Sequence, residues 1–300
     1  VSVAAARCPP LLAKAGGKVR VAQVMAGGFG EAGSDPAMET ALLEAAAIGG
    51  VRVLGPNCMG THSPSGKLTY MSGVDAAPGH VAVMAQSGGL STDVLRRGAQ
   101  RGLKFRALIT VGNSADVGPA ELLEAFHNDT KTHVIGIYIE DARRGRQLFD
   151  TLRAQNGHKP IVLLVGGTTA QGSRAAASHT GALAGDARAW SALGTQCGVA
   201  ITQSLDEFLD VMLAMQCLTP TPGRVTQEVV LFGNGGGTSV LAADAFGRAG
   251  LQVSPLPVAA QNALRDLNLP QGTSVINPID APAMALARED GAVARRIVDG

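Results

Sequence analysis

The residue with the clearest chemical potential in this sequence is His179. It stands among the small residues of the run 175–185, between Gly172 and Gly185, which we expect to form a tight loop. A neutral imidazole is a nucleophile, so a histidine carried on such a loop could accept a phosphoryl or acyl group. The alternative is a surface or N-cap histidine in a Gly/Ala-rich connection, and the surrounding residues must decide between the two.

Two glycine-rich turns, each between an expected strand and an expected helix, are candidate anion sites. They comprise Ser87, Gly88 and Gly89 after Gln86, and Gly235, Gly236 and Gly237. Backbone N–H groups at a helix start, helped by the helix dipole, bind anions. Many such turns carry glycine without any ligand. Neither turn matches the P-loop pattern or the dinucleotide-binding fingerprint, so neither indicates a Walker-type or dinucleotide site.

Three polar residues follow apolar strands. Glu140 could complement a helix dipole, or it could accept the second N–H of an imidazole and so orient His179, the interpretation we favour. Asn113 and Asp116 could line a site or cap the following helix, and we favour capping.

A regular series of strands and helices follows residue 79. We expect apolar strands at 80–85, 105–111, 133–139, 160–165 and 199–202, and helices at 90–100, 119–128, 143–154, 186–196 and 204–217. This alternation predicts a doubly wound parallel sheet covered on both faces. Right-handed crossovers bring the carboxyl ends of the strands to one edge, so Ser87, Asn113, Glu140 and Gly166 should converge there.

Two further α/β units flank this series, which gives domains at 1–72, 73–218 and 224–300. The first has strands at 18–25 and 51–54 around a helix at 36–48, and its turns Gly27-Gly28-Phe29 and Gly55-Pro56-Asn57 fall where such sheets bind ligands, although both also fit ordinary turns. After a linker at 219–223, the third has strands at 228–232 and 251–253, a helix at 239–249 and a turn-like motif at 276–280. We expect the first and third domains to be incomplete.

Composition excludes several classes of protein. The formal net charge is +1, only 16% of residues are charged and 3% are aromatic, which argues against nucleic-acid binding. No apolar run is long enough to cross a membrane, and no signal peptide is evident. The four cysteines are widely spaced and show no metal-ligand pattern, as expected of reduced thiols in a cytoplasmic protein without a metal site.

Six motifs, spread along nearly the whole chain, carry a family resemblance through their order and spacing. They are Gly27-Gly28-Phe29-Gly30-Glu31, Leu54-Gly55-Pro56-Asn57-Cys58-Met59-Gly60, Gln86-Ser87-Gly88-Gly89-Leu90, Val111-Gly112-Asn113-Ser114-Ala115-Asp116, Tyr138-Ile139-Glu140 and Ser178-His179-Thr180-Gly181-Ala182-Leu183-Ala184-Gly185. Together they resemble the NDP-forming acyl-CoA synthetases, in particular the α-type chains of ADP-forming acetyl-CoA synthetases, which are related to the succinyl-CoA ligase α-chain.

The resemblance implies a fold and a set of roles. The fold would be part of a Rossmann-like CoA-binding domain followed by flavodoxin-like domains with doubly wound parallel sheets. His179 would be the phosphorylated histidine, steadied by Glu140. The phosphate would be held by Ser87, Gly88 and Gly89, and by Gly235, Gly236 and Gly237. CoA would lie near Gly27, Gly28, Phe29 and Asn57.

The implied reaction is acyl-CoA + ADP + phosphate ⇌ carboxylate + CoA + ATP, that of an acid–thiol ligase. ATP or ADP with Mg²⁺ would bind an ATP-grasp domain, either a β-subunit or a fused domain, and the enzyme would be an oligomer. The family usually has a Lys and an Arg around the glycines where this chain has residues 165–168. That departure leaves an alternative open, a catalytically reduced protein that binds CoA or acyl-CoA. A dehydrogenase is a third, weaker alternative.

Overall fold

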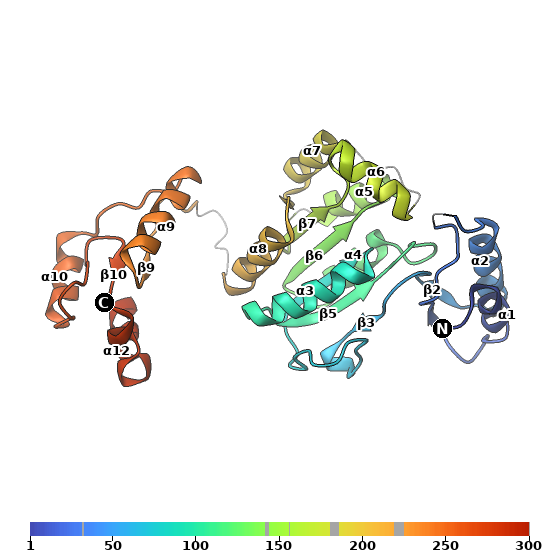
Figure 1. The fold of residues 1–300 in the computed structure, drawn as a ribbon, viewed down its shortest axis with the longest axis horizontal. Coiled ribbons are helices and arrows are strands. Elements are labelled where there is room, and N and C mark those ends of the chain that lie inside the picture. The colour runs from blue at the N-terminus through green and yellow to red at the C-terminus, as the bar shows by residue number, and fades with distance from the viewer. Residues whose placement is uncertain (32, 142–143, 156, 181–185, 219–224, 300) are drawn as a thin grey trace. The chain divides into compact units, whose positions relative to one another are not determined.

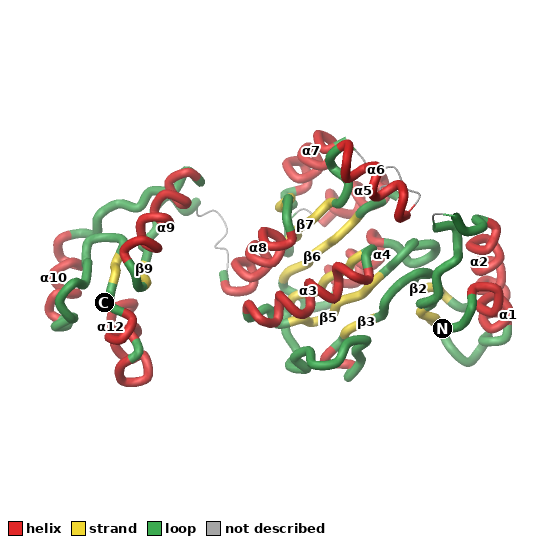
Figure 2. The backbone as a smooth tube through the Cα atoms, viewed as in Figure 1, coloured by secondary structure: helices red, strands yellow, loops and turns green. Residues whose placement is uncertain are grey.

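The chain forms two compact units, residues 1–219 and 220–300. The computed structural model describes residues 1–31, 33–141, 144–155, 157–180, 186–218 and 225–299, with only the backbone at 178–180 and 288–289 (Figures 1 and 2).

The first unit is built on a six-stranded sheet of order β3-β5-β4-β6-β7-β8. The strands are β3 (Thr61–His62), β4 (Val81–Ala85), β5 (Phe105–Thr110), β6 (Val134–Ile139), β7 (Ile161–Val165) and β8 (Ala200–Thr202). Strands β4 to β8 are parallel and follow the flavodoxin-like order, in which the chain reverses direction across the sheet between β4 and β6. The doubly wound fold class is therefore confirmed, and this reversal marks where ligands bind in such sheets.

Helices cover both faces of this sheet. Side chains of α4 (Pro119–Asn128), α5 (Gly145–Gln155) and α7 (Ala187–Cys197) pack in one apolar core, and those of α3 (Gly88–Arg101) and α8 (Leu205–Cys217) pack in the other. Because β4 and β7 are buried along their whole length, they read in the sequence as unbroken apolar runs.

Two elements of the first unit differ from expectation. Strand β3 is an extra edge strand, antiparallel to β5, so the sheet is not purely parallel; its two residues are too few to show an alternating pattern. Residues 170–180, expected as part of a connecting loop, form helix α6 (Ala170–Thr180). Alanine is a strong helix former, and Thr169 Oγ1 accepts the Gly172 N–H at 3.0 Å at the helix start.

The N-terminal region carries a separate small sheet. Strands β1 (Val21–Gln23) and β2 (Arg52–Leu54) are parallel and joined by α2 (Ala37–Gly49). With α1 (Cys8–Ala13) they enclose a core in which Phe29 is fully buried. Two 3₁₀ turns, η1 (Ala5–Arg7) and η2 (Pro64–Gly66), complete the region. Three of the four free cysteines of the chain, Cys8, Cys58 and Cys197, are buried.

The second unit is a smaller α/β arrangement. Strands β9 (Phe232–Gly233) and β10 (Ile279–Asp280) are parallel. Its helices are α9 (Gly236–Arg248), α10 (Val258–Asp266), α11 (Ala283–Leu286), η3 (Arg288–Gly291) and α12 (Ala292–Asp299). Of the expected strand at 228–232, only its end at Phe232 forms part of β9. Otherwise this segment and the expected strand at 251–253 meet only in a single bridge between Glu228 and Gln252. The motif at 276–280, expected as a turn, contributes β10, because it pairs with a strand nearly 50 residues away.

Candidate functional site

A cavity of about 470 Å³ opens at the carboxyl edge of the main sheet. The connection from β4 into α3 supplies Gln86, Ser87, Gly88 and Gly89, the loop after β5 supplies Gly112 and Asn113, the loop after β6 supplies Glu140 and Asp141, and the loop after β2 supplies residues 57–59. The convergence of Ser87, Asn113 and Glu140 expected from the topology is therefore observed. The cavity lies where the strand order reverses, as in other open α/β sheets.

The start of α3 presents backbone N–H groups at this cavity. Ser87 is the N-cap, and its Oγ accepts the Leu90 N–H at 3.3 Å. Among the described residues, the N–H groups of Gly88 and Gly89 have no hydrogen-bond partner. A Cβ at Gly88 would lie 2.9 Å from Met59 Cβ, whereas a Cβ at Gly89 would meet no described atom within 4 Å. This helix start can therefore receive an anion.

Tyr138 and Gln86 both hold Glu140 in place. Tyr138 Oη donates to Glu140 Oε1 at 2.7 Å, and Gln86 Oε1 accepts the backbone N–H of Glu140 at 2.5 Å and of Asp141 at 2.9 Å. Burial, reinforced by the hydrogen bond to Glu140, raises the pKa of Tyr138 well above its ordinary value. A Cβ at Gly166 would lie only 2.7 Å from Tyr138 Oη, so the glycine makes room for this pair.

Gln86 and Tyr138 have roles that sequence reasoning missed. Both lie inside the quoted motifs, but only the folded sheet shows that the Gln86 side chain caps the end of β6. Gly166 also lies at the expected edge, next to Glu140 Cγ.

His179 lies in the last turn of α6. Its side chain, like residues 181–185 of the same motif, falls outside the described part of the structure. The pairing of Glu140 with His179 therefore stays a prediction.

Asn113 joins the N-terminal region to the main sheet, and the capping interpretation was wrong for it. Its Nδ2 donates to Phe29 O at 3.1 Å, to Glu31 Oε1 at 3.2 Å and to Glu39 Oε2 at 3.3 Å, while its Oδ1 accepts from Asn57 Nδ2 at 3.4 Å. The following helix, α4, has Gly118 as its N-cap residue and begins at Pro119, with no side-chain cap.

Asp116 does not cap α4 either. Its carboxylate accepts from Arg52 at 2.9–3.0 Å and from the Val53 N–H at 2.7 Å, and Arg52 also pairs with Glu121. Partial burial favours the neutral acid, but the bonds from Arg52 and Val53 outweigh it and hold the pKa of Asp116 below its ordinary value. Asp116 therefore fastens β2 to the β5–α4 connection.

The glycine turn expected to contact CoA is closed by a carboxylate of the chain itself. Glu31 Oε2 accepts the N–H groups of Gly28 at 2.8 Å and Phe29 at 2.7 Å, and Ser34 Oγ lies 3.1 Å away. Although partial burial raises the pKa of Glu31, these bonds outweigh it and lower that pKa below its ordinary value. Gly27 lies beside Asn57, with 3.4 Å between its would-be Cβ and Asn57 Oδ1, and Asn57 lines the cavity.

The glycine-rich turn of the second unit is closed in the same way. Asp280 Oδ1 accepts the Gly235 N–H at 2.7 Å, and a Cβ at Gly236 would lie 3.5 Å from Asp280 Oδ2. A Cβ at Gly237 would meet no described atom within 4 Å. Of the three glycine turns, only the one at Ser87–Gly89 keeps its amides without a carboxylate among the described residues.

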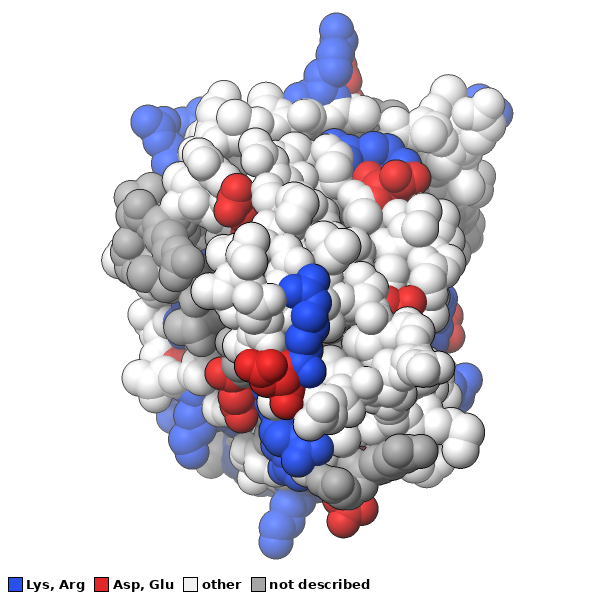
Figure 3. All heavy atoms as spheres, turned by 90° about the vertical axis from the view of Figure 1, so that its left-hand side faces the viewer, with Lys and Arg blue, Asp and Glu red and all other residues white. Residues whose placement is uncertain are grey.

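Neither the charged side chains on the face in view (Figure 3) nor the residue types that bind metals form a cluster of one kind among the described residues. On the face shown in Figure 3, basic side chains lie next to acidic ones, as expected for a net charge of +1. No cluster of three or more His, Cys, Asp or Glu that could hold a metal occurs within the described ranges. Among the helices so described, none is long and apolar enough to cross a membrane.

Comparison with known proteins agrees with this geometry. Residues 78–215 match the succinyl-CoA ligase like flavodoxin domain. The chain is 34% identical over 284 residues to the α-subunit of acetate–CoA ligase [ADP-forming] I of Pyrococcus furiosus, covering 92% of this chain and 60% of that one. It is 27% identical over 135 residues to the α-subunit of succinate–CoA ligase [ADP-forming] of Staphylococcus epidermidis, covering 44% of each chain.

A solved structure gives the same result over the full length. The dinucleotide-forming acetyl-coenzyme A synthetase 1 of Ca. Korarchaeum cryptofilum, in complex with phosphate and ADP, aligns with a TM-score of 0.82 and 31% identity, covering 100% of this chain and 70% of that one. The chain spans about 60% of the length of the curated α-subunit it matches. The fold, the six motifs and these relatives agree, and the chain belongs to the NDP-forming acyl-CoA synthetase family.

Proposed function

We propose that this chain is the α-type part of an ADP-forming acyl-CoA synthetase, an acid–thiol ligase that interconverts acyl-CoA + ADP + phosphate and carboxylate + CoA + ATP. The observation that carries the proposal is the open helix start at Ser87–Gly89, which shares one cavity with Glu140 and Asn57. The matched relatives are named ADP-forming acetate–CoA ligases, which supports the reaction and the nucleotide.

The reaction proceeds in three transfers. In the direction of ATP synthesis, a phosphate oxygen attacks the thioester carbon, the C–S bond breaks, CoA leaves as its thiolate, and an acyl phosphate is formed. A ring nitrogen of His179 then attacks phosphorus, the bond to the acyl oxygen breaks, and the carboxylate leaves. ADP finally takes the phosphoryl group from His179.

The residues of the cavity suit these steps. The Gly88 and Gly89 amides and the α3 dipole stabilise the phosphoryl oxygens while they carry charge. Glu140, fixed by Tyr138 and Gln86, accepts the N–H of one ring nitrogen of His179, which leaves the other nitrogen unprotonated and nucleophilic.

CoA fits the predicted residues only in part. Asn57 lines the cavity, where it would contact CoA. The Gly28 and Phe29 amides are taken up by Glu31, so they would bind a CoA phosphate only if that carboxylate moved. Gly27 and the loop around it would contact CoA by van der Waals packing.

Nucleotide binding is assigned to a further domain or subunit in this proposal. We propose that an ATP-grasp domain, as a β-subunit or a fused segment, binds ATP or ADP with Mg²⁺, that the assembly is an oligomer, and that it works in the cytoplasm. The α-subunit names of two relatives support the first point. In the second unit, Gly235, Gly236 and Gly237 would form a second phosphate site once Asp280 releases the Gly235 amide. The domain limits 1–72, 73–218 and 224–300 are part of this proposal.

The test is phosphorylation of the full chain with its nucleotide-binding partner. Labelled ATP should give an acid-labile, base-stable phosphoryl group that is lost in His179→Asn, greatly reduced in Glu140→Gln, and retained in the matched control His158→Asn. CoA binding by calorimetry without phosphohistidine in the unsubstituted protein would contradict the proposal and favour a CoA-binding regulatory protein.

A further inference from the structure

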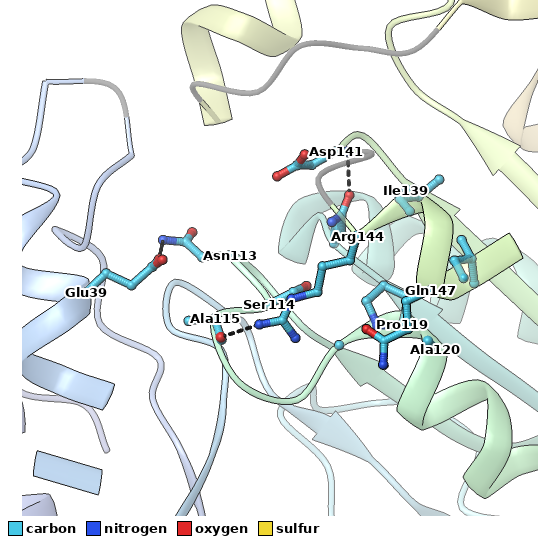
Figure 4. A pocket seen from close by; sticks show the side chains of 13 residues that line it. Glu39, Asn113, Ser114, Ala115, Pro119, Ala120, Ile139, Asp141, Arg144 and Gln147 are labelled. Atoms are coloured by element: carbon cyan, nitrogen blue, oxygen red, sulfur yellow. Dashed lines mark hydrogen bonds between the residues drawn. The ribbon is translucent and has the colours of Figure 1, made fainter. Parts of the chain in front are cut away.

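The side chain of Gln86 stands between two cavities of the first unit. It lines the larger cavity, beside the α3 helix start, and also a smaller one of about 110 Å³. Asn113 and Asp141 line both cavities as well. Figure 4 shows the smaller cavity, with Gln147 on one side of Arg144 and Asn113 on the other. Gln86 therefore belongs to the wall that separates the two spaces.

The two ends of the Gln86 amide are used differently. Its Oε1 accepts the backbone N–H groups of Glu140 at 2.5 Å and Asp141 at 2.9 Å. The backbone N–H of Gln86 donates to Tyr138 O at 3.1 Å, which fixes the residue a second time. Because N–H donors can meet only the oxygen of a side-chain amide, the orientation of the amide follows and Nε2 lies at its other end. This Nε2 has no hydrogen-bond partner in the described part of the chain.

A ligand in the larger cavity can reach Nε2 of Gln86. The Ser114 hydroxyl, which lines the smaller cavity, also lacks a described partner, but it is buried and closed to solvent. Gln86 is only half-buried, and its Nε2 is not closed off in this way. The amide donors thus face open space that a substrate can occupy.

The other side-chain amides of the larger cavity are already engaged. Asn57 Nδ2 donates to Asn113 Oδ1 at 3.4 Å, and Asn113 Nδ2 donates to Phe29 O at 3.1 Å. Of the side-chain amides that line this cavity within the described ranges, Gln86 alone keeps both N–H groups for a ligand.

The surroundings of Nε2 suit an oxygen that gains charge during a reaction. The two N–H bonds to Oε1 draw electron density towards that oxygen and so make the Nε2–H groups stronger donors. A cationic donor at this place would pair with the Glu140 carboxylate, which lines the same cavity, whereas a neutral amide does not compete for it. Because the amide is fixed before a substrate arrives, it stabilises developing charge without reorganisation.

We infer that Gln86 is a catalytic residue that donates through Nε2 to the carbonyl oxygen of the acyl group while phosphate attacks the thioester. The inference rests on the proposed function. As the phosphate oxygen bonds to the carbonyl carbon, the π electrons of the C=O bond move onto oxygen, and Nε2–H stabilises this oxyanion. The C=O bond then forms again, the C–S bond breaks, and CoA leaves as its thiolate. The Gly88 and Gly89 amides hold the phosphate oxygens, whose charge is present throughout.

The test compares two half-reactions in the full chain with its nucleotide-binding partner. Gln86→Glu replaces only Nε2 by an oxygen, so the bonds to the Glu140 and Asp141 amides remain possible while the donor is lost. Formation of acetyl-CoA from acetyl phosphate and CoA should slow about a hundredfold, as for the loss of one oxyanion donor. Phosphorylation of His179 by labelled ATP does not involve the acyl carbon and should be retained.

Two further variants sharpen this test. The matched control Gln147→Glu changes an exposed glutamine that lines only the smaller cavity, and it should retain both half-reactions. Gln86→Met removes the donor without adding a charge, and it stands in if Gln86→Glu does not fold. Acetyl-CoA formation in Gln86→Met should slow at least as much as in Gln86→Glu.

The outcomes separate this inference from the proposed function. Equal slowing of both half-reactions in Gln86→Glu would overturn the inference, because the donor would then serve phosphate. Unimpaired acetyl-CoA formation in either folded Gln86 variant would overturn it as well. If the unsubstituted chain with its partner formed neither acetyl-CoA nor phosphohistidine, the proposed function would fail, and the inference with it.

Discussion

The packing of Gly166 against Tyr138 and Glu140 gives a quantitative prediction. In Gly166→Ala the new Cβ would lie 2.7 Å from Tyr138 Oη and 3.1 Å from Glu140 Cγ, whereas ordinary contacts are nearer 3.5–4.0 Å. Overpacking costs about 1–3 kcal/mol. Displacing the hydroxyl also weakens its bond to a carboxylate, which is worth about 1.5–3 kcal/mol. We expect Gly166→Ala to destabilise the first unit by about 2–5 kcal/mol.

The decisive measurement is a double-mutant cycle by urea unfolding. Tyr138→Phe alone should cost about 1.5–3 kcal/mol, because the hydrogen bond from the Tyr138 hydroxyl to the Glu140 carboxylate is lost. In the Gly166→Ala background the same change also removes the atom that the new Cβ meets most closely, so its cost should be smaller by at least about 1 kcal/mol. Gly89→Ala, which meets no described atom, is the packing control. Additivity of the two changes within about 0.5 kcal/mol would refute this account of the Gly166 contact.

Two more substitutions test the contacts of the N-terminal region. Because the pKa of Glu31 is lowered in the folded chain, its carboxylate stabilises the fold above the unfolded pKa of about 4.3 and loses this effect as the pH falls through the lower folded value. Glu31→Gln should therefore lower the Tm at pH 7 and reduce the drop in Tm between pH 5 and pH 3. A drop in Tm over this pH range equal to that of the unsubstituted protein would contradict this. Arg52→Lys keeps the charge but loses the forked contact with Asp116 and Glu121, so the free energy of unfolding should fall by about 1 kcal/mol. Scanning calorimetry of this variant and of the exposed control Arg146→Lys measures the effect. Equal loss of stability in the two variants would contradict the prediction.

Sequence patterns predicted the main sheet well and the small elements poorly. Strand β4 is a fully buried apolar run between Gly79 and Gly88, so its unbroken apolar pattern and the flanking glycines were enough to predict it. Strands β3 and β10 have two residues each and exist only through pairing with distant segments. Helix α6 was not predicted, because the glycines next to its alanines made the whole segment resemble a loop.

The candidate site was predictable in its location and only partly in its chemistry. Topology alone brought Ser87 and Glu140 to one edge. The occupation of the first glycine turn by Glu31 could not be foreseen, because the sequence of an anion-binding turn is the same whether a ligand or a nearby side chain fills it. Ser114 gave no signal, since its unpartnered hydroxyl is a property of its surroundings.

The contact at Gly112 determines how the cavity beside the α3 helix start can change shape. A Cβ there would lie 2.1 Å from Pro56 O and 2.3 Å from Asn57 O, so the two main chains touch with no side chain between them. Asn113 N–H also donates to Pro56 O at 3.0 Å, which pins the same two strands of backbone together. This wall of the cavity can therefore move only as a single piece.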